Sequence, residues 1–124
     1  MGDVMKFLIA VSLFLLVVFV APVHCDDMGT GHFLLNACKA FLAAGTKGDF
    51  NAGYCLGFIH SNEQEEMVRK VSDTAKKIYC MPKDVTDEQL ARVFIKYLEA
   101  HPEQLHLAAS QLIWMAYSNV WRCK

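Results

Sequence analysis

Apolar residues recur at helical spacing in the first part of the chain that follows residue 30. Leu34, Ala37, Cys38 and Phe41 fall on one face, and Gly45 then supplies a stop signal. This pattern predicts a helix that ends near residue 45.

A second helix is predicted from about residue 52 to Cys80-Met81-Pro82, where proline ends it. Its apolar face is interrupted at residues 60–66, which are polar all round. Two interpretations stay open: a solvated stretch of one long helix, or a break that projects an acidic segment toward a partner. The apolar positions before and after the gap are Ala52, Cys55, Leu56, Ile59, Met67, Val71, Ala75 and Ile78.

The clearest helix start in the chain is a capping box, with Thr86 at the N-cap and Gln89 three residues later. A single apolar stripe follows it. The third predicted helix therefore begins after Thr86, and its stripe comprises Leu90, Val93, Phe94, Tyr97 and Leu98.

A fourth helix is predicted from about Glu103 to Trp121, with Pro102 in its first turn. It is apolar on both sides, because Trp114, Tyr117 and Trp121 lie opposite the Leu105 face. Such a helix is either central in its own bundle or shared with another subunit, so these three aromatic residues are a possible dimer face. The pattern as a whole predicts an all-α, up-down four-helix bundle.

The N-terminus has a different character. Lys6 precedes an uncharged apolar run over residues 7–20, and Cys25 ends a short segment before two aspartates. This is typical of a secretory signal peptide, and the run is short for a membrane span of about 20 residues. We expect cleavage after Cys25, which leaves residues 26–124 as a single exported domain in the periplasm, with a lipoprotein or an uncleaved anchor as alternatives.

Composition limits the classes of partner. The 124 residues are 54% hydrophobic and 20% charged, with a formal net charge of −1. Acidic and basic residues are mixed, and no basic stripe exists to collect phosphates, so we expect no nucleic-acid partner. After signal cleavage we expect no membrane association.

Export changes the meaning of the cysteines. Five are present, and cleavage after Cys25 leaves Cys38, Cys55, Cys80 and Cys123. An even number in a small exported domain predicts two disulfides. Antiparallel helices place Cys38 near Cys55 and Cys80 near Cys123, which is the preferred pairing; Cys38 with Cys80 and Cys55 with Cys123 is the alternative. A bond from Cys55 to Cys80 requires a hairpin, because a continuous helix would separate them by roughly 35–40 Å.

No catalytic arrangement is evident. The serines lack a nucleophile-elbow context, the cysteines are expected to be oxidised, and no cysteine pair has zinc-ligand spacing. His101 and His106 are five residues apart and do not share a helix face. We therefore expect no enzyme, no metal and no cofactor.

Several blocks together resemble the Tai/Rap family of immunity proteins, which protect bacteria against type VI secretion amidase effectors. The resemblance rests on residues 53–59 (GYCLGFI), 80–82 (CMP) and 85–89 (VTDEQ), and it extends from Phe33 to Cys123. It implies a periplasmic all-α protein that occludes the cleft of a peptidoglycan amidase toxin, often as a homodimer.

The polar gap, residues 60–66 of the second predicted helix, supplies candidate contacts with a partner, because burial in a core cannot explain its polar composition. We expect His60, Asn62, Glu63 and Glu66 to bind the toxin. A charge-assisted hydrogen bond is roughly twice as strong as a neutral one, and an amidase cleft can accept a carboxylate or amide. The alternative function is a small periplasmic helical chaperone or stress protein, which has similar size, helicity and disulfide use.

Overall fold

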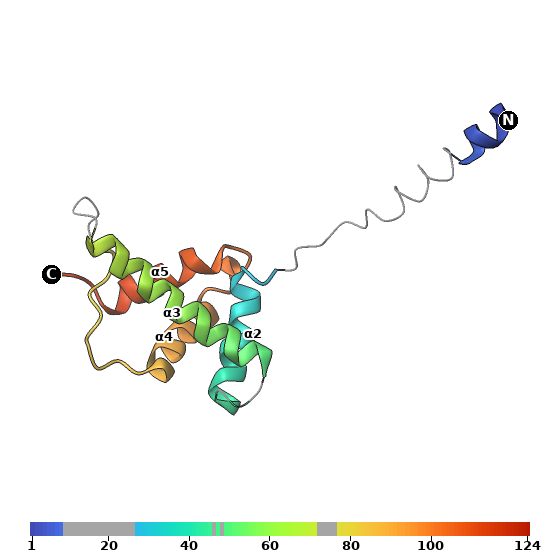
Figure 1. Cartoon of the computed structure of the whole chain (residues 1–124). Coiled ribbons are helices and arrows are strands. Elements are labelled where there is room, and N and C mark those ends of the chain that lie inside the picture. The colour runs from blue at the N-terminus through green and yellow to red at the C-terminus, as the bar shows by residue number, and fades with distance from the viewer. Residues whose placement is uncertain (9–26, 46, 48, 72–76) are drawn as a thin grey trace.

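The structure is a computed structural model that describes residues 1–8, 27–45, 47, 49–71 and 77–124, with the side chains of 66–71 excepted. Within these ranges the regular elements are helices and there is no strand, so the predicted all-α class is confirmed (Figure 1). The elements are α2 (Gly31–Ala44), α3 (Phe50–Val71), α4 (Asp87–Ala100), the short 3-10 helix η1 (Pro102–Gln104) and α5 (Ala109–Val120).

The start of α4 is fixed by the predicted capping box. The backbone N–H of Gln89 donates to the Thr86 hydroxyl at 3.3 Å, and the backbone N–H of Thr86 donates to Gln89 Oε1 at 2.9 Å. Both donors would otherwise lack a partner at the helix terminus. Asp87 in the first turn adds a negative charge where the helix dipole favours it.

The core lies where α2, α3, α4 and α5 meet. Each helix contributes the face that the apolar periodicity predicts, and phenylalanine rings join α3 to α4, with Phe58 stacked on Phe94 at 6.2 Å. The largest fully buried side chains are Tyr117, Phe94, Leu34, Ile59, Leu90, Leu98, Leu112, Ile113, Cys38 and Cys55.

The last helix begins later than the sequence predicts. Instead of a helix from Glu103, the chain forms η1, leaves the helical path at residues 105–108 and re-enters it at Ala109. The backbone of this stretch is paired with the N-terminus of α2. His32 N–H donates to the Leu105 carbonyl at 3.0 Å, and Ala109 N–H donates to the Gly29 carbonyl at 2.7 Å.

Gly31 permits this close approach. A Cβ atom at this position would lie 2.6 Å from Leu112 Cδ1 and 3.1 Å from the backbone of Leu105. No side chain fits between the start of α2 and the 105–108 turn, and the backbone hydrogen bonds between them replace those of a helix. The tertiary contact therefore outweighs the local helical pattern.

The second predicted helix is also shorter than expected. The polar stretch 60–66 is part of the continuous helix α3, which supports the solvated-helix interpretation, but α3 ends at Val71. Residues 77–86 are not helical, so the prediction of a helix to Cys80 is wrong. Cys80 instead donates its backbone N–H to the Trp121 carbonyl at 2.8 Å, which draws this segment along the end of α5. Ala75, which was expected in the helix, lies outside the described residues.

Two disulfides connect the elements. Cys38 of α2 is bonded to Cys55 of α3, and Cys80 is bonded to Cys123 in the C-terminal tail. This is the preferred pairing of the sequence analysis. It follows from the antiparallel course of α2 and α3 and from the return of the tail past residue 80.

In the described ranges, no helix has the length and apolarity needed to cross a membrane. Most of the expected signal peptide, residues 1–25, lies outside those ranges, so its cleavage remains a prediction.

Candidate partner-binding site

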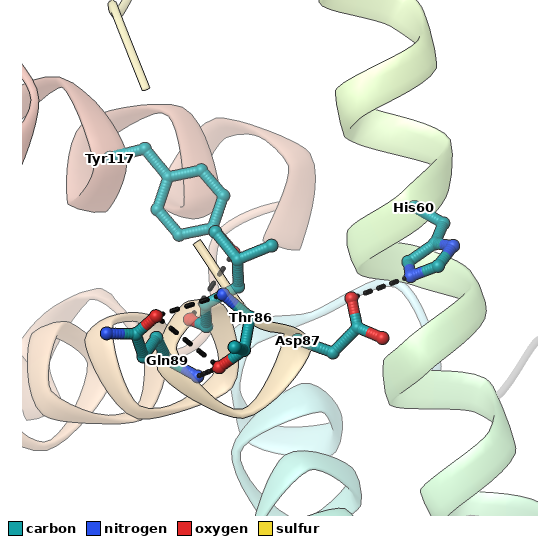
Figure 2. A network of polar contacts seen from close by, with 6 residues as sticks. His60, Thr86, Asp87, Gln89 and Tyr117 are labelled. Carbon is teal, nitrogen blue, oxygen red and sulfur yellow. Dashed lines mark hydrogen bonds and ion pairs between the residues drawn. The ribbon is translucent and has the colours of Figure 1, made fainter. Parts of the chain in front are cut away.

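His60 lies on the outer face of α3 and contacts the first turn of α4 (Figure 2). Its Nε2 is 2.9 Å from Asp87 Oδ1, and both side chains are about half exposed, at 48% and 45%. Asp87 follows the N-cap Thr86 directly, so the capping box fixes where this carboxylate stands. The interaction is an ion pair when the imidazole is protonated and a hydrogen bond when it is neutral.

Glu63 follows on the same helix and is half-buried. Burial raises the pKa of this carboxyl, while the nearby His60 lowers it and Asp87 raises it. Histidine and two carboxylates therefore act on one another across the α3–α4 contact. Glu63 is the member of this group whose charge is least well solvated.

A cleft of about 280 Å³ opens beside Glu63. The non-helical segment 77–83 forms its other wall, through Lys77, Tyr79, Cys80, Met81, Pro82 and Lys83. Two lysines and one carboxylate thus border a cleft that also contains the exposed end of a disulfide. This wall was not predicted, because the helical pattern assigns the segment to a helix end. The signal in the sequence is Pro82, with Lys77 and Lys83 on either side of it.

The structure corrects the role expected for Asn62. Only 4% of this residue is exposed, and its Nδ2 donates to the Phe58 carbonyl at 2.8 Å within α3. Asn62 Oδ1 is buried and has no hydrogen-bond partner. Its position in the polar gap suggested a surface residue, yet 62 falls on the inward side of the helix, three residues after the buried Ile59. It cannot contact a partner in this conformation.

Glu66 belongs to α3, but its side chain lies outside the described residues, so its role remains a prediction. His60 and Glu63 are the expected contact residues that the structure brings together at an accessible surface.

The aromatic residues of α5 do not form one exposed face. Tyr117 is completely buried, and its hydroxyl donates to the Leu90 carbonyl at 3.3 Å. Its ring packs against Tyr79 at 5.4 Å and Trp121 at 5.2 Å. Burial raises the pKa of the Tyr117 phenol far above its ordinary value, so it stays neutral. The dimer face expected at Trp114, Tyr117 and Trp121 is therefore wrong for Tyr117, which belongs to the core.

The 77–86 segment is the reason why Tyr117 is buried rather than part of an exposed face. A helical wheel shows which side of α5 is aromatic but not what covers it, and Tyr79 covers it here. Trp114 and Trp121 are partly buried and also pack against the core.

The described part of the chain holds no group of histidine, cysteine and acidic side chains arranged for a metal ion. The four cysteines of the described domain are all in disulfides and offer no thiolate. The arrangement is that of a small disulfide-bonded helical domain.

Comparison with known proteins identifies the family. The family model for Rap1a immunity proteins matches residues 30–123, and the chain belongs to this family. It is a type VI secretion immunity family, so the protein is an immunity protein whose partner is a cognate effector toxin. No curated protein and no solved structure matches the chain.

Proposed function

We propose that this protein acts in the periplasm by binding a type VI peptidoglycan amidase effector and occluding its active-site cleft. The observation that supports the proposal is the polar surface of α3 beside the cleft of about 280 Å³. It offers a histidine and a carboxylate on a rigid helix, and such preorganised groups lose little entropy on binding.

His60 and Glu63 are the proposed contacts. His60 is held by Asp87, and Glu63 carries a charge that burial already disfavours. A partner that donates hydrogen bonds to Glu63 would satisfy this carboxylate in the ionised state. An amidase whose cleft contains a protonated histidine or a backbone N–H donor fits that requirement.

The test uses a purified type VI peptidoglycan amidase effector, sought first among the genes that neighbour the gene of this chain. Purified wild-type protein is expected to bind it and to inhibit its hydrolysis of peptidoglycan fragments. The double variant His60→Ala/Glu63→Ala should lose at least about 2 kcal/mol of binding free energy, the threshold of an interface hot spot. Its thermal unfolding should remain close to that of the wild type, because His60 is exposed, Glu63 is only partly buried, and substitutions outside the core usually shift stability by about 0.5 kcal/mol or less.

Lys39→Ala is the matched control. Lys39 forms an ion pair with Glu99 at 2.7 Å, and these side chains are 50% and 52% exposed, much as in the His60–Asp87 pair. The control breaks a surface pair between α2 and α4 and should leave affinity unchanged. Failure of the wild type to inhibit the amidase would refute the function; equal affinities for the double variant and Lys39→Ala would refute the site.

A further inference from the structure

A second hollow lies between α4 and α5, at the end of α4 away from Asp87. It is a groove of about 360 Å³, and its walls are mainly apolar, from Val93, Tyr97 and Ala116. Val120, which is 56% exposed, lies at its border. Ligand sites in proteins are typically apolar hollows of about 300–1,000 Å³ with a few well-placed polar groups.

The aromatic wall of the groove is held in place. The Tyr97 hydroxyl lies 3.1 Å from Gln104 Oε1 and 3.3 Å from Met115 Sδ. The His101 ring stacks on Tyr97 with centroids 4.2 Å apart, and its Nδ1 is 2.8 Å from the Tyr97 carbonyl oxygen. Because a carbonyl only accepts, Nδ1 donates this bond and Nε2 is left for another partner. A wall fixed in this way needs little ordering when an occupant enters.

The charged side chains that line the groove are basic, while Glu103 lies outside the lining and, after burial, raises the pKa of the Tyr97 phenol. Lys96 and His101 are the basic residues that line the groove, and none of its lining residues carries a carboxylate. Glu99, the acidic residue within this part of α4, pairs with Lys39 of α2 instead. The complementary occupant has an apolar body and an adjacent negative charge.

We propose that this groove receives an apolar side chain of the effector protein, flanked by a carboxylate that pairs with Lys96. This inference rests on the proposed function and adds a second contact to it. The groove begins at Val93, about 9 Å along α4 from Asp87 at a rise of about 1.5 Å per residue, and is thus separate from the His60–Glu63 surface. Large apolar anchors in preformed pockets are the usual hot spots of protein interfaces.

The first experiment measures the groove without the effector. The probes are 8-anilinonaphthalene-1-sulfonate, which is apolar and anionic, and its neutral analogue N-phenyl-1-naphthylamine, followed by fluorescence. Ala100→Phe fills the groove from an exposed position at the end of α4, and Ala43→Phe makes the same change at an exposed position of α2. Ala100→Phe should weaken binding of both probes roughly tenfold or more, whereas Ala43→Phe should not.

The charge is tested by Lys96→Met. This variant should weaken binding of the anionic probe several-fold, because it removes the positive charge. Binding of the neutral probe should be unchanged, because methionine keeps most of the apolar length of the lysine side chain. Equal probe affinities for wild type and Ala100→Phe would overturn the site. An equal loss for both probes in Lys96→Met would overturn the role of its charge.

The second experiment measures affinity for the amidase effector by calorimetry. If the wild type binds and Ala100→Phe binds at least roughly tenfold more weakly than Ala43→Phe, the inference is supported. If the wild type binds and the two variants bind equally, the inference fails while the proposed function stands. If the wild type does not bind, the proposed function itself fails. A change of molecular mass in light scattering for Ala100→Phe alone would identify the groove as a contact between copies of this chain and overturn the inference.

Discussion

The Cys38–Cys55 disulfide lies inside the core between α2 and α3, where both residues are fully buried. The Cys80–Cys123 disulfide joins two non-helical segments at the surface, where Cys80 is exposed and Cys123 half-buried. The first bridge spans 17 residues and the second spans 43. The same covalent bond thus serves one region that is already well packed and another that has few helical hydrogen bonds.

These two regions separate the two ways in which a disulfide stabilises a fold. Loop-closure entropy alone assigns about 3 kcal/mol to the shorter loop and about 4 kcal/mol to the longer one. Burial reverses this ranking of the two bridges. Replacing a cysteine of the packed core by alanine also removes the contacts of its sulfur atom, which costs about 1 kcal/mol for each cysteine. We therefore expect the core bridge to contribute more, despite its shorter loop.

The largest effect is expected from Cys38→Ala/Cys55→Ala. The variant should lose about 5 kcal/mol of unfolding free energy, as loop entropy and lost core contacts act together. Urea denaturation monitored by circular dichroism gives this value. Since domains are stable by only about 5–15 kcal/mol, much of the variant should be unfolded at 37 °C. A loss smaller than that of the surface pair would show that loop entropy dominates both bridges.

A smaller loss, about 3 kcal/mol, is expected from Cys80→Ala/Cys123→Ala. Without this bridge the exposed tail can fray, and the freedom that the native state gains offsets part of the entropy gained by the unfolded chain. Exposure also predicts the order of reduction. Under limiting reductant, alkylation and mass analysis should find Cys80 and Cys123 labelled before Cys38 and Cys55. Simultaneous labelling of all four cysteines would mean that the two regions open together.

The smallest effect concerns Glu63, beside the surface bridge. A carboxyl with a raised pKa favours folding while it is protonated, and this contribution is lost as pH rises from about 4.5 through the folded-state pKa. Glu63→Gln should therefore gain stability relative to wild type above that range, by less than about 0.5 kcal/mol because solvent screens the site. Thermal unfolding between pH 4 and 7 measures the difference.

Glu88→Gln supplies the opposing control. Glu88 is in the first turn of α4, where the helix dipole favours negative charge, so this variant should lose stability at neutral pH. If both variants shift in the same direction, the burial of Glu63 is not what governs its charge.

Local signals sufficed for much of the fold. The Thr86–Gln89 capping box fixes the start of α4 because both of its hydrogen bonds lie within four residues of sequence. The apolar periodicity of α2 and of the first half of α3 places Cys38 and Cys55 on facing sides of two antiparallel helices. The antiparallel chain direction then favours their pairing over the alternative of Cys38 with Cys80, and the structure has the favoured one. Of the candidate site, His60 and Glu63 could be found because a polar gap in an apolar stripe is visible in the sequence.

The tertiary structure decided what local pattern cannot express. Residues 105–108 have an acceptable helical pattern, yet their carbonyls accept from the start of α2, where Gly31 lets the backbones meet. The 77–86 segment covers the aromatic side of α5 and places Tyr117 in the core. Periodicity reports which side of a helix is apolar; it does not report which distant segment packs there. The sequence therefore determined the all-α class, the start of α4 and a preference between two disulfide pairings, whereas long-range backbone pairing and side-chain burial decided where the last helix begins and which surfaces remain open for a partner.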